Sequence, residues 1–259
     1  MGTSTVGDLV AAIRERLAAA GDPERAVAQQ RYMKSALPYW GLSTGDVRRE
    51  VRSVLALTPP LDRRDWEAAI RTLWDQATHR EEWYAALAIA RRPAYRHFRD
   101  ADALLLWRHL IVAGAWWDVV DETASHLVGP LLRSSDAGAG VAGEGAAGAD
   151  DAGEGAAVRP VLIAWATCDN LWLRRTAILS NLGAGDRADL ELLTYAIEAN
   201  LEPRLQGTAF EREFFLRKAI GWALREHART DPDWVRRFVA DHAEQLSGLS
   251  RREALKHLG

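Results

Sequence analysis

The chain has 259 residues, of which 48% are hydrophobic and 27% are charged, as in an ordinary folded domain. Its single cysteine, Cys168, excludes an internal disulfide and fits a reducing compartment. The formal net charge of −3 argues weakly against a nucleic-acid partner. No basic-then-apolar leader opens the chain, and the apolar run Leu110 to Trp117 is too short to span a bilayer. We therefore expect a soluble cytoplasmic protein that does not enter a membrane.

Apolar residues recur at three- and four-residue spacing along almost the whole chain, which predicts helices. Helix-start signals occur at Ser43-Thr44 and Asp231-Pro232, and no alternating strand pattern is found. The predicted helices are 8–20, 24–36, 44–57, 62–77, 81–91, 97–112, 115–129, 159–167, 170–182, 187–200, 209–229, 231–243 and 250–258. The predicted fold class is all-α. Helix pairs of roughly 35–45 residues fall in the range of HEAT-type repeats, although no clean sequence repeat is present.

Residues 134–158 differ from the rest, because they are almost entirely Ala, Gly and acidic residues. Removing the five acids of this segment raises the formal net charge of the chain from −3 to +2. Two G-x-G-x-x-G matches lie within it, but no hydrophobic strand precedes them, so they do not indicate a nucleotide site. We expect a flexible surface insertion that contributes little to a core.

Metal and thiol chemistry find little support in the sequence. The seven histidines lie on separate predicted helices without the spacing of a metal site. Cys168 has no surrounding catalytic motif, and a lone cysteine in a helical chain is usually a small core residue. We therefore expect neither a bound metal nor a cofactor.

The segment "AGAWWDVVDETASHLVGPLL" joins two tryptophans to two aspartates. On a helix, Trp117 shares a face with Asp121, whereas Asp118 points elsewhere. Trp116 falls on an apolar stripe that should face the core: Val119, Val120, Ala124 and Leu127. Trp117 could instead be a core residue, with Asp121 capping a helix or pairing with an arginine. Spacing alone favours that second interpretation, because aromatic residues in helices are most often buried.

Aromatic and basic residues lie together in three other segments. "LWLRRTAIL" places Arg174 and Arg175 in an apolar helix, where one of them must be exposed or paired. In "FFLRKAIGWALREHAR", Trp222 has basic neighbours at helical spacing, and "QQRYMKSALPYWG" combines a tyrosine with bases. Such clusters suit a nucleic-acid surface, but they also describe buried aromatics with a solvated basic flank.

Together these segments resemble the bacterial DNA alkylation repair glycosylases of the AlkD type. The matching runs are "RYMKSALPYWGL", "WWDVVD", "LWLRRTAIL", "EFFLRKAIGWALREHARTDPDWV" and "LSRREALKHLG", in the family's order over nearly the whole chain. The resemblance implies one HEAT-like domain over residues 1–259, a right-handed solenoid of antiparallel helical pairs with a concave DNA-binding face. It also implies a monomer that excises N3- and N7-alkylated purines from double-stranded DNA, and that is nucleoid-associated when bound. The insertion at 134–158 has no counterpart in this family pattern.

Matched position by position, the resemblance implies that Asp121 is the catalytic carboxylate and that Trp117 and Trp222 face the lesion. It implies that Arg175 contacts DNA and that Tyr32 lies near the groove. Basic residues beside these positions complete the predicted DNA-binding set: Lys34, Arg174, Lys218 and Arg225. The resemblance thus reverses the preference drawn from spacing alone. Two alternatives remain, a non-catalytic helical-repeat protein that binds DNA or protein, and a protein-interaction solenoid unrelated to nucleic acid.

Overall fold

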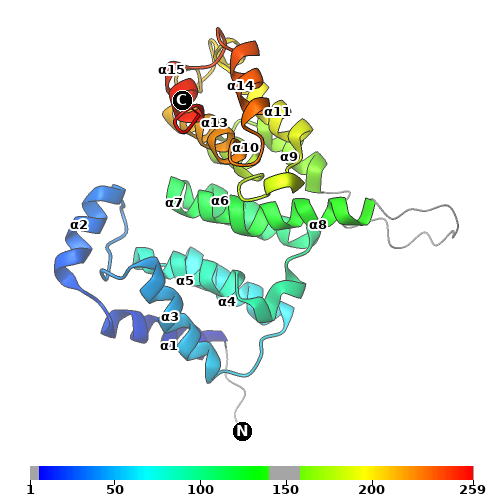
Figure 1. The fold of residues 1–259 in the computed structure, drawn as a ribbon. Helices are drawn as coiled ribbons and strands as arrows, with labels where there is room; N and C mark the ends of the chain where they lie inside the picture. The colour runs from blue at the N-terminus through cyan, green and yellow to red at the C-terminus, as the bar shows by residue number, and fades with distance from the viewer. Residues whose placement is uncertain (1–5, 140–157, 259) are drawn as a thin grey trace, which may run out of the picture. The chain divides into compact units, whose positions relative to one another are not determined.

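The computed structural model describes residues 6–139 and 158–258 and consists of helices joined by short loops (Figure 1). No strand occurs in these two ranges, so the prediction of an all-α chain is confirmed. No helix of the described ranges is both long and apolar enough to span a membrane. The chain divides into two compact units, Met1–Arg99 and Asp100–Gly259, which are described separately below. A single domain over residues 1–259, and its concave face, stay predictions.

The first unit is a small helical core with one peripheral helix. Its elements are α1 (Val6–Ala19), α2 (Pro23–Met33), α3 (Thr44–Ala56), α4 (Arg63–Asp75), α5 (Arg80–Ala90) and the 3-10 helix η1 (Pro93–Phe98). Helices α1, α3, α4 and α5 pack on one another through fully buried side chains such as Leu17, Val47 and Trp66. Helix α2 buries only Met33, so it needs another means of attachment.

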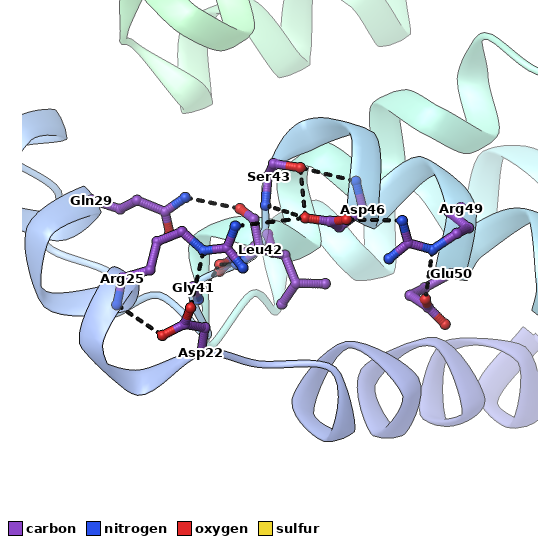
Figure 2. A network of polar contacts seen from close by, with 10 residues as sticks. Asp22, Arg25, Gln29, Gly41, Leu42, Ser43, Asp46, Arg49 and Glu50 are labelled. Carbon is purple, nitrogen blue, oxygen red and sulfur yellow. Dashed lines mark hydrogen bonds and ion pairs between the residues drawn. The ribbon is translucent and has the colours of Figure 1, made fainter.

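Polar contacts attach α2 to the loop before α3 (Figure 2). Asp22 caps α2 by accepting from the Arg25 backbone N–H at 3.1 Å. The Gln29 amide donates to the Leu42 carbonyl at 2.9 Å, and the Arg25 guanidinium lies 3.8 Å from the Asp46 carboxylate. These contacts order the exposed helix α2 without a hydrophobic interface.

Gly41 lies at the closest approach of this loop to α2. Its φ is +97°, and a Cβ atom built there would lie 2.0 Å from the Asp22 carbonyl oxygen. Its backbone N–H also donates to the buried Glu81 carboxylate at 2.8 Å, which holds the loop in place. Only glycine meets both the conformational and the steric requirement.

We predict that Gly41→Ala lowers the free energy of unfolding by roughly 1–3 kcal/mol or more, because positive φ and overpacking act together. Urea denaturation followed by circular dichroism measures this loss. The control is Gly45→Ala in α3, where a Cβ meets only the Ser43 hydroxyl at 3.6 Å. That variant should be neutral or more stable by about 0.5–1 kcal/mol, because alanine favours a helix. Equal stability of the two variants would contradict the prediction.

The second unit is built around α10. Its elements are η2 (Ala101–Ala103), α6 (Leu104–Gly114), α7 (Trp117–Thr123), the π-helical turn η3 (Ala124–Val128), α8 (Gly129–Ala139), α9 (Val158–Thr167), α10 (Leu171–Leu179), η5 (Gly185–Arg187), α11 (Leu190–Glu198), α12 (Glu202–Leu205), α13 (Phe214–His227), α14 (Pro232–Asp241) and α15 (Gly248–Ala254). Helix α10 packs against α6, α7, α9, α11 and α13, and every residue from Trp172 to Leu179 is buried.

Several predicted helix boundaries are wrong, and three of the wrong helix starts have a clear local reason. The helix expected at 97–112 is preceded by 3-10 turns and begins at Leu104, since Asp100 caps the Ala103 N–H. The helix expected from 115 begins at Trp117, because Ala115 is left-handed with φ of 35°. The helix expected at 209–229 begins at Phe214, where the Glu213 side chain accepts from the Phe215 N–H.

The predicted loop at 134–158 also has wrong limits. Helix α8 continues to Ala139, and the Ser134 hydroxyl donates to the Leu131 carbonyl. Helix α9 begins one residue earlier than predicted, because Val158 is packed into the core with 2% exposure. Residues 140–157, where the flexible insertion was expected, lie outside the described residues.

Candidate active site

A buried ion pair between α7 and α10 is the central feature of the second unit. Arg175 Nε donates to Asp121 Oδ1 at 2.7 Å, and Arg175 Nη2 donates to Asp121 Oδ2 at 2.8 Å. The side chains are 12% and 5% exposed for Asp121 and Arg175. Two parallel charge-assisted hydrogen bonds fix the plane of the carboxylate. The pair therefore presents an oriented carboxylate with limited access to water.

Local structure places the arginine at this depth. The Asn170 side chain accepts from the Trp172 and Leu173 N–H groups, both at 3.0 Å, and so starts α10. Arg175 then projects between α7 and α13, where its Nη1 donates to the Phe215 carbonyl at 2.5 Å. All three guanidinium nitrogens thus have protein acceptors, as a buried charge requires.

An aromatic cluster borders the ion pair. The Trp116 and Phe215 ring centroids are 5.5 Å apart, and the Phe215 and Trp172 centroids are 5.0 Å apart. The Arg175 guanidinium carbon lies 5.9 Å from the Phe215 ring centroid. In the described part of the chain, the buried indole N–H of Trp116 has no hydrogen-bond acceptor. The cluster lowers the local dielectric and contains one buried donor without an acceptor among the described residues.

The surroundings of Asp121 change its acidity. Burial raises the pKa of the Asp121 carboxyl above the ordinary value, and the nearby Asp118 charge adds to that shift. The Arg175 guanidinium acts in the opposite direction, through its hydrogen bonds and its charge. Because its pKa is raised, the Asp121 carboxylate takes up a proton at a higher pH than an exposed aspartate does.

The helix that carries Asp121 is irregular just beyond it. The turn η3 is π-helical, a form often found at functional sites. Gly129, directly after this turn, lies so close to α10 that a Cβ would be 2.5 Å from the Ser180 carbonyl oxygen. This close approach of the start of α8 to the end of α10 adds to the packing of α7 against α10, where Asp121 meets Arg175.

The structure separates the two adjacent tryptophans, but not as the helical spacing implied. The stripe of Val119, Val120, Ala124 and Leu127 is buried as predicted. Trp116, expected on the same stripe, is the extended residue before α7 and packs on Phe215 instead. Trp117 is half-buried in the first turn of α7, one helical turn before Asp121.

Trp222 lies on α13, which like α7 packs against α10. It is half-buried and seven residues after Phe215, so the two side chains share a face of the helix. Since Phe215 contacts Arg175 and Trp116, this face is the one directed toward the ion pair. The contacts found in the described residues do not include one between Trp117 and Trp222.

Lys218 and Arg225 are joined by a residue that the sequence did not single out. Glu253 on α15 accepts from Lys218 Nζ at 2.9 Å and also pairs with Arg225. Helix α15 passes directly over Gly221, where a Cβ would lie 2.6 Å from the Glu253 Cβ. Both basic side chains keep partial exposure, so their predicted DNA contacts stay predictions.

Hydrogen bonds within the protein hold the Arg174 guanidinium at the end of α9. Its Nε donates to the Cys168 carbonyl at 2.6 Å and its Nη2 to the Thr167 carbonyl at 2.8 Å, which satisfies the end of α9. Its Nη1 donates to the Asn200 side chain at 3.0 Å. One of the two adjacent arginines was expected to be exposed or paired. Both are in fact buried, and only Arg175 pairs with a carboxylate, whereas Arg174 donates to backbone carbonyls and an amide oxygen. The buried network around Arg174 lends no support to the DNA contact that was predicted for it.

Tyr32 and Lys34 belong to the first unit. Tyr32 is 75% exposed on α2, and Lys34 ends that helix in a left-handed conformation with φ of 50°. A single exposed aromatic ring is normal on a protein surface, so this exposure by itself does not indicate a contact surface. Their predicted role in DNA binding stays a prediction.

Metal binding has no visible basis in residues 6–139 and 158–258. No group of three or more His, Cys, Asp and Glu side chains there could hold an ion.

Comparison with known proteins identifies the family. The family model described as DNA alkylation repair enzyme matches residues 13–258. The chain belongs to the DNA alkylation repair enzyme family. A solved structure titled as a predicted DNA alkylation repair enzyme from Enterococcus faecalis has the same fold, with a TM-score of 0.72. The two sequences are 24% identical, and the match covers 92% of this chain and 97% of the other. A search of curated proteins returned no match.

Membership confirms the resemblance drawn from the sequence motifs and makes alkylated DNA the expected substrate of this DNA alkylation repair enzyme. The matched range includes all the candidate site residues, from Tyr32 to Glu253. Sequence reasoning did not find Trp172, Phe215 or Glu253. The sequence carries no signal for Glu253, because its position opposite Gly221 appears only when α13 packs against α15.

Proposed function

We propose that this DNA alkylation repair enzyme is a glycosylase that excises N3- and N7-alkylated purines from double-stranded DNA. The observation that carries the proposal is the buried, doubly hydrogen-bonded Asp121 carboxylate beside an aromatic cluster. A carboxylate in such surroundings suits stabilisation of a developing cation. The protein would act without a cofactor, in the cytoplasm and as a monomer.

The reaction does not need a general acid to protonate the leaving base. An N3- or N7-alkylated purine is already cationic, so when its glycosidic bond breaks, the electron pair moves to the base and a neutral base leaves. Positive charge then develops on the deoxyribose as an oxocarbenium ion. Asp121 would stabilise that charge and orient the water that adds to C1′, as carboxylates do in glycosidases.

Arg175 constrains this mechanism. A carboxylate paired with a guanidinium has almost no net charge at a distance, so Asp121 can stabilise a cation only at contact range. Arg175 would act as a positioning residue that keeps the carboxylate plane fixed. Trp117 and Trp222, on the two helices flanking α10, would offer the negative faces of their rings to the cationic sugar.

The direct test is release of 7-methylguanine from a methylated duplex under single-turnover conditions. Base release well above the spontaneous rate supports the glycosylase. Tight binding of the same duplex without release would instead identify a non-catalytic DNA-binding protein, and absence of both would leave a protein-binding role. Parallel duplexes with 3-methyladenine and bulkier adducts would rank the lesions.

We predict that the release rate falls as the pH decreases. Burial raises the pKa of Asp121 above the ordinary value of about 3.9, so activity that needs the carboxylate is present above the raised pKa and is lost as pH falls through it. Single-turnover rates between about pH 5 and 8, corrected for spontaneous depurination, measure this. An increase in the corrected rate toward acidic pH would contradict it, because the carboxyl would then act as an acid.

A further inference from the structure

The first unit contains a basic cavity that lies entirely within residues 48–94. It has a volume of about 460 Å³ and is bordered by α3, the end of α5 and the start of η1. Of the described residues that line it, four are arginines and none is acidic: Arg48, Arg52, Arg91 and Arg92. The remaining lining is apolar, and its Val51 and Leu55 are buried in the core.

Two of the four arginines lie on α3 and the other two directly after α5. Arg48 and Arg52 are four residues apart, so they lie on one face of α3, where like charges at this spacing repel. Arg91 and Arg92 follow the last turn of α5, and Pro93 then starts η1. The negative end of the α5 dipole stabilises the positive charge of Arg91. No such helix end stabilises the charges of Arg48 and Arg52, which lie within α3.

Acidic side chains of the same helices are engaged elsewhere. On α3, Asp46 pairs with Arg49 and Arg25, and Glu50 pairs with Arg49 (Figure 2). On α5, Glu81 accepts the N–H groups of the loop before α3, at 2.8 Å from Gly41. None of these carboxylates lines the cavity.

Further arginines strengthen the positive potential beside the cavity. Arg96 lies in η1 and Arg99 directly after it. The pKa of Arg99 is lowered by burial first, and then by the charges of Arg91 and Arg96. A concentration of like charges costs folding free energy that a bound anion would offset.

We propose that this cavity is a phosphate-binding site, formed by Arg48, Arg52, Arg91 and Arg92, and that its ligand is a backbone phosphodiester of duplex DNA. Guanidinium groups donate in a planar fork that matches two phosphate oxygens, and the apolar floor strengthens the attraction. The proposal rests on DNA as the substrate of the proposed function. It adds an anchor within the first unit that contacts undamaged backbone and takes no part in base release.

The double variant Arg52→Gln with Arg92→Gln tests the site. Neither side chain forms an ion pair with another described residue, so their replacement should leave the fold intact. The matched control is Arg64→Gln with Arg71→Gln on α4, which removes the same charge from the same unit outside the cavity lining. Thermal unfolding of both variants verifies folding.

Fluorescence anisotropy with an undamaged labelled duplex, over a series of salt concentrations, is the main measurement. The cavity variant should bind about tenfold more weakly at low salt, and the slope of log affinity against log salt should decrease by about one or two. The control should change by less than about threefold with its slope retained. Equal changes in the two variants, or an unchanged slope in the cavity variant, would overturn the DNA assignment.

Inorganic phosphate distinguishes the two sources of the anion. If phosphate raises the melting temperature of the unaltered protein but not of the cavity variant, while both bind the duplex equally, the site takes free phosphate rather than DNA. If neither probe separates the variants, the site itself is refuted. Because the duplex carries no lesion, a chain that fails to release 7-methylguanine would overturn the proposed function without affecting this result.

Discussion

Asp121→Asn should reduce single-turnover release of 7-methylguanine by about 10²–10³-fold, the usual cost of removing one charge-stabilising group from an enclosed site. Asparagine keeps the size of the side chain and one oxygen for Arg175, but it carries no charge for the oxocarbenium ion. Affinity for undamaged duplex should remain close to that of the unaltered protein, because the carboxylate makes no favourable contact with phosphate.

The control for this experiment is Asp118→Asn, which removes a carboxylate one helical turn from Asp121 in the same helix. Asp118 is only half-buried, and the three guanidinium nitrogens of Arg175 donate to Asp121 and Phe215, so the loss of the Asp118 charge should change the rate by less than about threefold. Chemical denaturation of both variants separates a catalytic defect from unfolding. Release by Asp121→Asn at the unaltered rate would contradict the assignment of this residue.

Arg175→Met should lower the free energy of unfolding by about 3–5 kcal/mol, because it leaves the Asp121 carboxylate buried without its partner. The expectation that Arg175 is a DNA contact at the surface predicts a much smaller loss, within about 0.5 kcal/mol. Urea denaturation at neutral pH distinguishes the two. A loss below about 1 kcal/mol would mean that the pair is weak in solution.

The double variant Arg175→Met with Asp121→Leu provides the control. Replacing both charged partners by apolar side chains of similar volume removes the unpaired charge, so much of the lost stability should return. A double-mutant cycle then gives the coupling between the two positions. If the double variant is no more stable than Arg175→Met, the loss in the single variant arises from packing and not from the stranded carboxylate.

Local properties of the sequence predicted most of the helices and which of the candidate site residues share a helix face. Helix hydrogen bonds join residues four apart, so periodicity and caps such as Ser43 and Asp231 predicted where α3 and α14 begin. The same periodicity put Trp117 and Asp121 on one face, and the order of the motifs predicted the family. The boundary near Trp117 could not be predicted, because nothing in the sequence marks Ala115 for a left-handed conformation.

Contacts between distant segments were decided only by the tertiary structure. Arg174 and Arg175 are adjacent and chemically identical, yet one ends α9 and the other holds Asp121, which is 54 residues earlier in the chain. The basic cavity likewise joins arginines of α3 to those that follow α5. The physical reason is that burial and ion pairing depend on which helix faces pack together, whereas spacing within one helix shows only which side chains share a face.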